Sequence, residues 1–139
     1  MVEQAVDNPV FRKGFADHFK LEKIHNFYGM VEQLGSVFME GPDSLLYPPN
    51  FSEVIIRDPQ TFEPVRDGQP GVIQVLSLIP ESYPGHSLLT EDLGVIEAVD
   101  SGLDGWNGAG LRILGRVAKA ELRGCSDVIS EMRGSHGGL

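Results

Sequence analysis

The chain has 139 residues, which favours a single domain, and its 41% hydrophobic and 22% charged residues are ordinary for a globular protein. The net charge of −9 repels the phosphates of DNA and RNA, which argues against nucleic-acid binding but not against a local site for one nucleotide. No apolar run approaches the roughly 20 residues of a membrane span, and the single cysteine cannot form an intrachain disulfide. These features predict a cytoplasmic protein with no membrane span.

The first predicted element is a helix. Asn8 and Pro9 are typical of a helix start, because asparagine caps the first turn and proline fits its first position. The helix is expected to reach about His18. Aromatic residues recur every four positions, which places them on one helix face: Phe11, Phe15 and Phe19.

The next segment predicts a short strand and a turn. Residues 21–28 are expected to form the strand, with Ile24 and Phe27 buried. Residues 31–39 predict either a second helix or an irregular turn, since Gly35 weakens a helix there.

From residue 41 the chain becomes rich in proline, which excludes long helices. Strand-like runs lie between the prolines at 54–56 and 72–79, and after the last proline at 87–89, 94–99, 111–114 and 117–122. Asp67-Gly68 predicts a turn before the second run, and the last two runs are expected to pair around Gly115. Ser126 is expected to cap a short closing helix.

These patterns predict an α+β fold, in which a short α/β segment precedes a small, distorted antiparallel β-barrel-like unit. The expected units are residues 1–40 for the α/β segment, 41–125 for the β-rich subdomain, and 126–139 for a short helix and a flexible tail.

The first candidate site residues follow the predicted strand. A ring at a strand end, here Tyr28, can stack on a base, and Gly29 permits a sharp turn after it. The Glu32 carboxylate can hold Mg²⁺ near phosphates, because Mg²⁺ prefers oxygen ligands. A buried tyrosine, a turn and a surface glutamate are the alternative.

A second candidate lies in the stretch LLTEDLG. Asp92 follows an apolar pair and precedes Leu93-Gly94, which places its carboxylate at the boundary between a strand and a turn. A carboxylate in such a position can accept two hydrogen bonds from a ribose diol. The alternative is that Thr90, Glu91 and Asp92 form a solvated turn.

Cations and a thiol make up the third candidate group. The Arg116 guanidinium can form paired hydrogen bonds to a ribose or a phosphate, and Lys119 and Arg123 are alternative cations. Cys125 lies between Arg123 and a predicted helix start, and a nearby cation and a helix amino terminus both favour the thiolate. An inert, half-buried cysteine is the alternative.

The order of these three motifs resembles a known superfamily. YGMVEQ is similar to the aromatic-Gly-x-Thr-Glu motif of the adenylate-forming enzymes, LLTEDLG to their Thr-Gly-Asp-Leu motif, and LGRVAKAELRG to their Gly-Arg…Arg-Gly hinge motif. The longer strings HNFYGMVEQLGSVFME, SYPGHSLLTEDLG and GRVAKAELRGCSD resemble one branch, the LuxE-type acyl-protein synthetases of bacterial bioluminescence. The resemblance covers roughly residues 10–130 and implies the carboxy-terminal part of a larger enzyme, in which residues 1–40 would end a nucleotide-binding subdomain.

For the nucleotide, the resemblance implies four site residues, Tyr28, Gly29, Asp92 and Arg116, and a role for three of them. Tyr28, followed by Gly29, would pack on adenine. Asp92 would bind the ribose hydroxyls, and Arg116 would contact the ribose or phosphate side.

For catalysis, the resemblance implies two residues. Glu32 would ligate Mg²⁺ beside the phosphates, and Cys125 matches the position at which this branch carries the acyl group. The sequence departs from the pattern of the superfamily in two respects. Val31 replaces the usual threonine, and the Ser/Thr/Gly-rich phosphate loop that family members carry upstream is absent.

The implied function is that of a ligase that uses ATP and Mg²⁺ to activate a fatty or aryl carboxylic acid as acyl-AMP and then transfers the acyl group to a thiol. The expected partners are an acyl-accepting protein thiol or an acyl-CoA reductase-like protein, and the amino-terminal half of the parent enzyme; a homo-oligomer is also compatible. The alternative is a stand-alone, non-catalytic module that binds a nucleotide or a partner.

Overall fold

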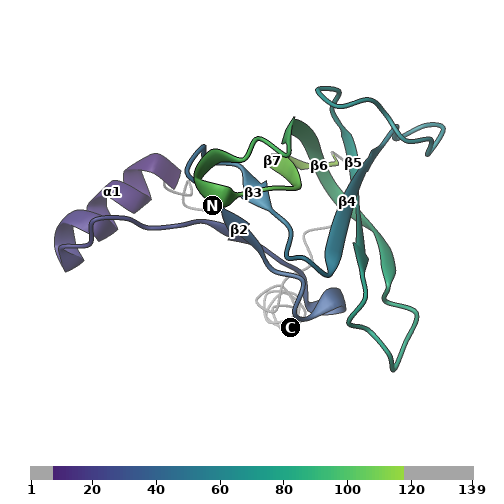
Figure 1. Cartoon of the computed structure of the whole chain (residues 1–139), viewed down its shortest axis with the longest axis horizontal. Coiled ribbons are helices and arrows are strands. Elements are labelled where there is room, and N and C mark those ends of the chain that lie inside the picture. Colours follow the sequence, from purple (N-terminus) through teal and green to yellow (C-terminus); the bar gives the residue numbers. More distant parts are fainter. Residues whose placement is uncertain (1–7, 118–139) are drawn as a thin grey trace, which may run out of the picture.

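The computed structural model describes residues 8–117, which form one α-helix, α1 (Asn8–Phe19), two short 3₁₀ helices and seven strands. The 3₁₀ helices are η1 (Val31–Gln33) and η2 (Leu103–Gly105). The strands are β1 (Phe27–Tyr28), β2 (Phe38–Glu40), β3 (Leu46–Tyr47), β4 (Ser52–Arg57), β5 (Gly71–Ser77), β6 (Ser87–Val99) and β7 (Ala109–Arg116). Figure 1 shows α1 to one side of the strands, with the β4–β5–β6 region at the opposite end of the molecule.

The strands form one antiparallel sheet in the order β1-β2-β3-β7-β6-β5-β4. Three strands separate β1 from β6 in this order, yet Tyr28 of β1 donates a hydrogen bond to Asp92 of β6. The sheet is therefore curled into a half-barrel. The predicted α+β class and the antiparallel, barrel-like unit are confirmed.

Apolar side chains on the inner face of the curl form the core. The buried cluster consists of Phe38, Val54, Ile56, Ile73, Val75, Ile96, Ala109 and Leu111. Strand alternation explains which residues face inward, since successive side chains point to opposite faces. In β2, for example, Phe38 and Glu40 are buried and Met39 is exposed.

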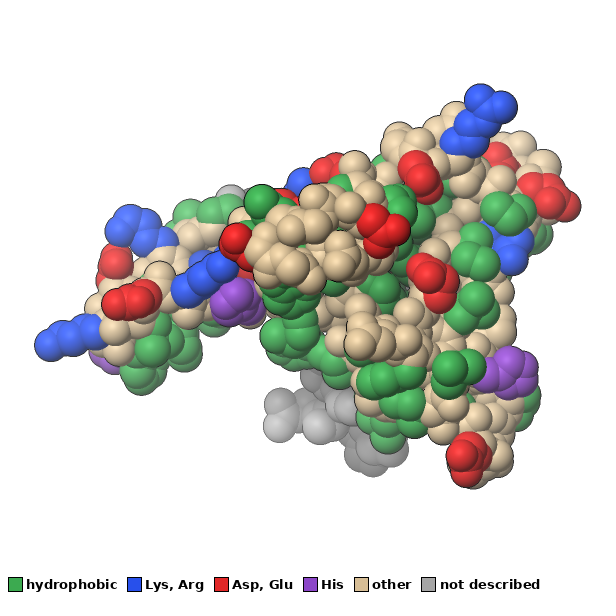
Figure 2. All heavy atoms as spheres, in the orientation of Figure 1, with side chains coloured by type: hydrophobic (Ala, Val, Ile, Leu, Met, Phe, Trp, Pro, Cys, Tyr) green, Lys and Arg blue, Asp and Glu red, His purple; other side chains and the backbone are tan. Residues whose placement is uncertain are grey.

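Helix α1 lies where the sequence predicts a helix, and its three phenylalanine rings lie on one face, as expected. None of its side chains is fully buried, and hydrophobic side chains gather along one side of it (Figure 2). A polar contact ties the helix to the sheet instead. Arg12 Nη1 lies 2.8 Å from the buried carboxylate of Glu40, which also accepts the Asn26 N–H at 2.9 Å.

The strand predicted over residues 21–28 is wrong in extent, because only Phe27–Tyr28 pairs with a neighbour. The predicted burial of Phe27 is also wrong, since its side chain is 71% exposed. It pairs with Met39 on the outer face, whereas Tyr28 pairs with Phe38 on the inner face. A strand of two residues is too short for the alternation of apolar and polar residues to show which side chain faces inward.

The strands predicted at 54–56 and 72–79 are confirmed as β4 and β5, although β5 ends at Ser77, two residues earlier than predicted. The two weak strands at 87–89 and 94–99 prove to be parts of one long strand, β6. Gly115 lies inside β7, where its φ of 138° makes glycine favourable. Apart from Val117, the strand predicted at 117–122 and the closing helix predicted at Ser126 lie outside the described residues.

Strands on both sides of residue 40 belong to the same sheet, and the division into units at residues 40 and 125 stays a prediction. Within residues 8–117, no helix has both the length and the apolar character needed to cross a bilayer.

Candidate functional site

The curl of the sheet brings Tyr28 and Asp92 together from distant parts of the chain. The Tyr28 hydroxyl donates to Asp92 Oδ2 at 2.8 Å. The Tyr28 ring is half-buried and meets the fully buried Phe38 ring edge-on, with centroids 5.9 Å apart. Packing from one side and a hydrogen bond at the tip therefore fix the position of this ring.

Arg116 completes a three-residue group, Tyr28–Asp92–Arg116. Asp92 and Arg116 are register partners across β6 and β7, and Arg116 Nε lies 3.4 Å from Asp92 Oδ1. Their side chains are 21% and 42% exposed, respectively. The Asp92 carboxylate thus has a neutral donor on one oxygen and a cation near the other, and its side chain is partly exposed to solvent.

The environment keeps the Tyr28 hydroxyl protonated. Burial raises the pKa of Tyr28, and its hydrogen bond to the Asp92 carboxylate raises it further. The nearby Thr90 hydroxyl and Arg116 guanidinium lower this pKa by smaller amounts. Tyr28 therefore acts as a hydrogen-bond donor to Asp92 at neutral pH.

Gly29 follows Tyr28 on the surface. A Cβ placed on Gly29 would come no closer than 3.6 Å to another atom, an ordinary van der Waals contact with Val37. Packing therefore does not require glycine at this position.

Glu32 lies on η1 with its side chain exposed. Within residues 8–117, no hydrogen bond or ion pair joins its carboxylate to another residue, and no group of three or more His, Cys, Asp or Glu side chains converges. A single carboxylate is compatible with Mg²⁺ held mainly by phosphates and water. It does not provide a cage made of protein ligands alone.

The neighbouring Gln33 has a role that the sequence did not indicate. Its side chain is 1% exposed, and Nε2 donates to the backbone oxygen of Gly85 at 2.8 Å. The Tyr83 hydroxyl in the same loop donates to the backbone oxygen of Glu32. Both contacts hold η1 against the β5–β6 loop and so fix the position of the Glu32 backbone. A glutamine between polar and apolar neighbours offers no pattern from which such burial could be predicted.

The predicted thiol Cys125 and the alternative cations Lys119 and Arg123 lie outside the described residues. The structure therefore brings together Tyr28, Asp92 and Arg116, and it places Glu32 on a separate, exposed helical turn.

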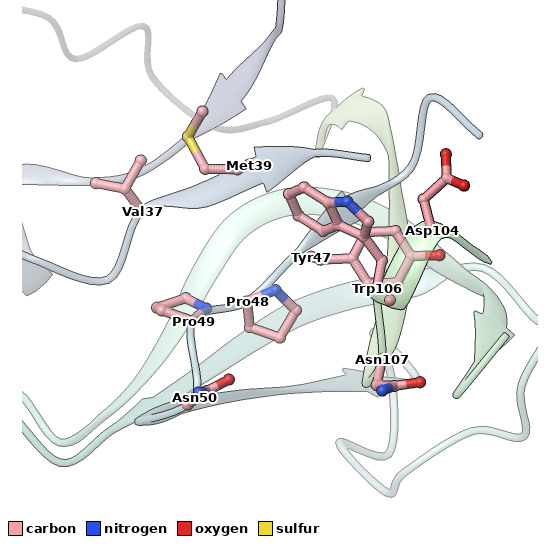
Figure 3. A pocket seen from close by; sticks show the side chains of 10 residues that line it. Val37, Met39, Tyr47, Pro48, Pro49, Asn50, Asp104, Trp106 and Asn107 are labelled. Atoms are coloured by element: carbon pink, nitrogen blue, oxygen red, sulfur yellow. The ribbon is translucent and has the colours of Figure 1, made fainter. Parts of the chain in front are cut away.

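A shallow pocket of about 290 Å³ lies elsewhere on the sheet, between β2, β3 and η2. Figure 3 shows the Tyr47 and Trp106 rings close together, with Pro48 and Pro49 to one side and the amides of Asn50 and Asn107 below. The two ring centroids are 5.4 Å apart. None of the predicted site residues in the described part of the chain lines this pocket.

Comparison with known families gives one match across almost the whole chain. The family described as acyl-protein synthetase, LuxE, matches residues 2–133. The long-chain-fatty-acid–luciferin-component ligase of Aliivibrio fischeri is 25% identical over 124 residues, which make up 88% of this chain and 32% of the relative. The corresponding ligase of Vibrio harveyi is 25% identical over 132 residues, or 93% of this chain and 34% of the relative. The chain thus spans about a third of the length of these relatives.

Two solved structures are similar in part. One is the luciferase-like enzyme from the nonluminescent mealworm Zophobas morio, with 21% identity and a TM-score of 0.48 over 76% of this chain and 28% of that one. The other is an ATP-bound RpMatB-BxBclM chimera, with 22% identity and a TM-score of 0.45 over 67% of this chain and 20% of that one.

Proposed function

Because the chain belongs to the LuxE acyl-protein synthetase family, we propose that it is the nucleotide-binding, carboxy-terminal part of an ATP-dependent ligase. The ligase would activate a fatty or aryl carboxylate as acyl-AMP and transfer the acyl group to a thiol. The observation that carries the proposal is the Tyr28–Asp92–Arg116 group, in which residues from three separate motifs meet in space. The names of the two bacterial relatives favour a long-chain fatty acid as the substrate.

The Asp92 carboxylate is suited to the ribose of ATP. A carboxylate has about four lone-pair sites, and one hydrogen bond from Tyr28 and one long contact from Arg116 leave room for more donors. Two vicinal hydroxyls can donate to the same carboxylate. The Tyr28 ring next to it offers an apolar surface on which adenine can stack.

The remaining roles belong to groups at the phosphate and acyl ends. Arg116 would stabilise negative charge on the ribose–phosphate side. Glu32 would supply one oxygen ligand to Mg²⁺, which when bound neutralises phosphate charge during the transfer. Cys125 is the proposed acceptor thiol, from which an acyl-CoA reductase-like partner could take the acyl group.

The proposed reaction has two covalent steps, adenylation of the acid and transfer of the acyl group to a thiol. A carboxylate oxygen of the acid forms a bond to the α-phosphorus of ATP, and the bond from that phosphorus to pyrophosphate breaks. The thiolate then attacks the acyl carbon, a carbon–sulfur bond forms, the bond from that carbon to the phosphate oxygen of AMP breaks, and AMP leaves. The chain contributes positioning and charge stabilisation to the first step.

The first test uses two carboxylates on β6, each of which is paired with an arginine of β7. Asp92→Asn should weaken ATP binding roughly tenfold or more, because a charge-assisted hydrogen bond contributes about 1.5–3 kcal/mol. Glu97→Gln is the control, since Glu97 pairs with Arg112 at 2.7 Å and has no assigned role. Calorimetric titration of the 139-residue chain with ATP measures both; equal effects of the two substitutions would contradict the ribose assignment.

A second measurement separates the ligase from the non-catalytic alternative. ATP–pyrophosphate exchange that appears only when a fatty acid is added would support the ligase. ATP binding without exchange would instead favour a module that binds the nucleotide and does no chemistry.

A further inference from the structure

The β5–β6 pairing is interrupted beside Asp92. The register between the two strands shifts between Val72 and Gln74. On β5 only Ile73 lies inside this irregularity, whereas on β6 it spans residues 90–92. β6 therefore carries two extra residues in a bulge. Bulges redirect a strand and its side chains, and they leave backbone groups without their ladder partners.

The Thr90 hydroxyl replaces the missing ladder bonds. It donates to the backbone oxygen of Ile73 at 2.9 Å and accepts the backbone N–H of Asp92 at 3.1 Å. Ile73 is fully buried, so without this donor its carbonyl would lose a partner in the core. One side-chain hydroxyl thus satisfies a donor and an acceptor across the bulge.

The other side of the bulge is fixed by β7. Val117 N–H donates to the backbone oxygen of Glu91 at 2.9 Å, and Asp92 is in register with Arg116. The backbone of residues 90–92 is therefore held from both neighbouring strands. The outcome is that the Asp92 side chain points to Tyr28 and Arg116.

We propose that Thr90 is a positioning residue, whose hydroxyl sets the bulge that aims the Asp92 carboxylate at Tyr28 and at the ribose of the nucleotide. The link to ribose rests on the proposed function, while the link to Tyr28 does not. Valine has the shape of threonine without the hydroxyl, so Thr90→Val removes both hydrogen bonds with little change in volume. Thr90→Ser keeps the hydroxyl and should restore the positioning.

The chain provides a matched control. Thr61 also accepts a backbone N–H with its hydroxyl, from Glu63 at 3.3 Å, but it lies in the exposed loop after β4. Thr61→Val therefore removes a similar hydrogen bond in a loop that is not part of the bulge in β6.

The nucleotide-free experiment follows the ¹³Cζ resonance of Tyr28 in tyrosine-labelled chain, which reports on the hydrogen bond to Asp92. Thr90→Val should shift this resonance in the direction given by Asp92→Asn, while Thr90→Ser and Thr61→Val should leave it in place. A Tyr28 resonance that is unchanged in folded Thr90→Val would overturn the proposal, whether or not the chain binds ATP. If no variant binds ATP, the proposed function fails and this experiment alone decides the positioning role.

The nucleotide experiment compares ATP with 2′,3′-dideoxy-ATP, which lacks the ribose diol. The wild-type chain should prefer ATP, and Thr90→Val should reduce that preference by about fivefold or more, the equivalent of about one hydrogen bond. Thr90→Ser should restore it. A merely structural role would weaken both nucleotides equally, and equal weakening would contradict the link between Thr90 and the ribose.

Discussion

At the scale of single residues, Gly94 decides how closely β6 can pack against the core. A Cβ at this position would lie 2.8 Å from Ile73 Cδ1 and 3.0 Å from the backbone oxygen of Arg112. Ile73 is fully buried and cannot move aside freely. Packing therefore explains the glycine that closes the Thr-Glu-Asp-Leu-Gly stretch, and no ligand needs to be invoked for it.

Gly94→Ala should consequently lower the free energy of unfolding by about 1–3 kcal/mol, the usual cost of overpacking a core. Gly14→Ala is the opposite case, because Gly14 lies inside α1 with no atom within 4 Å of an added Cβ. That substitution should raise the free energy of unfolding by roughly 0.5–1 kcal/mol, since alanine favours a helix more than glycine does. Urea unfolding of both variants checks this; a tolerated Gly94→Ala would show that β6 is packed less tightly than the structure indicates.

Residue type and order could predict the members of the Tyr28–Asp92–Arg116 group, but not their contact. The motifs indicated an aromatic ring, a carboxylate and a cation in a fixed order along the chain. Their meeting depends on the curl of the sheet, which no local pattern encodes. Thr90 was missed for a related reason: its role arises from a register shift between strands, and the alternation of apolar residues does not report register.

At the scale of elements, a buried polar contact rather than an apolar face joins α1 to the sheet. Arg12 and Glu40 meet at 2.8 Å, and the Glu40 side chain is 4% exposed. Burial by itself would raise the pKa of Glu40, but the Asn26 N–H and the Arg12 guanidinium outweigh it and hold the pKa below its ordinary value. Because the pKa is lower in the folded state, the contact stabilises the fold above the ordinary pKa of about 4.3 and is lost as pH falls through the folded value.

Glu40→Gln should therefore be less stable than the wild type by about 1–3 kcal/mol at pH 7, because it removes a charged partner from Arg12. The difference should begin to narrow as pH falls below about 4.3 and should be lost as pH falls through the lower pKa of the folded state, where the wild-type carboxylate also becomes neutral. Urea unfolding at a series of pH values measures the gap. Glu22→Gln, an exposed glutamate before β1, should have no such effect at any pH. A gap that stays constant down to low pH would mean that Glu40 acts through its shape and not its charge.

The elements with strong local signals could be predicted, and the others depended on tertiary contacts. The Asn-Pro start placed α1, and dense β-branched runs placed β4 and β5. β6 was divided in two because the polar residues 90–92 interrupt its apolar pattern. In the structure these residues form the bulge from which the Asp92 side chain projects. The apolar alternation therefore failed to predict a continuous strand at the candidate site itself.

At the scale of the whole molecule, Phe38 joins the core to the candidate site. It lies on β2 with no exposed surface, belongs to the central apolar cluster, and is the cross-strand partner of Tyr28. The sheet is open between β1 and β4, so packing inside the curl has to hold its two ends in place. The stability of the fold and the position of the Tyr28 ring are therefore expected to change together.

Phe38→Ala should lower the free energy of unfolding by about 3–5 kcal/mol, because it leaves a cavity inside the curl. This is a large share of the roughly 5–15 kcal/mol that stabilises a typical domain, so Phe38→Leu, with a cost expected to be about 1–2 kcal/mol, provides a folded variant. Phe27→Ala on the adjacent, outer position should change stability by no more than about 0.5 kcal/mol. Urea unfolding gives the stabilities, and the ¹³Cζ resonance of Tyr28 reports on the site. Phe38→Leu should shift that resonance and Phe27→Ala should not; an unchanged resonance in Phe38→Leu would mean that Asp92, rather than the core, holds the Tyr28 ring.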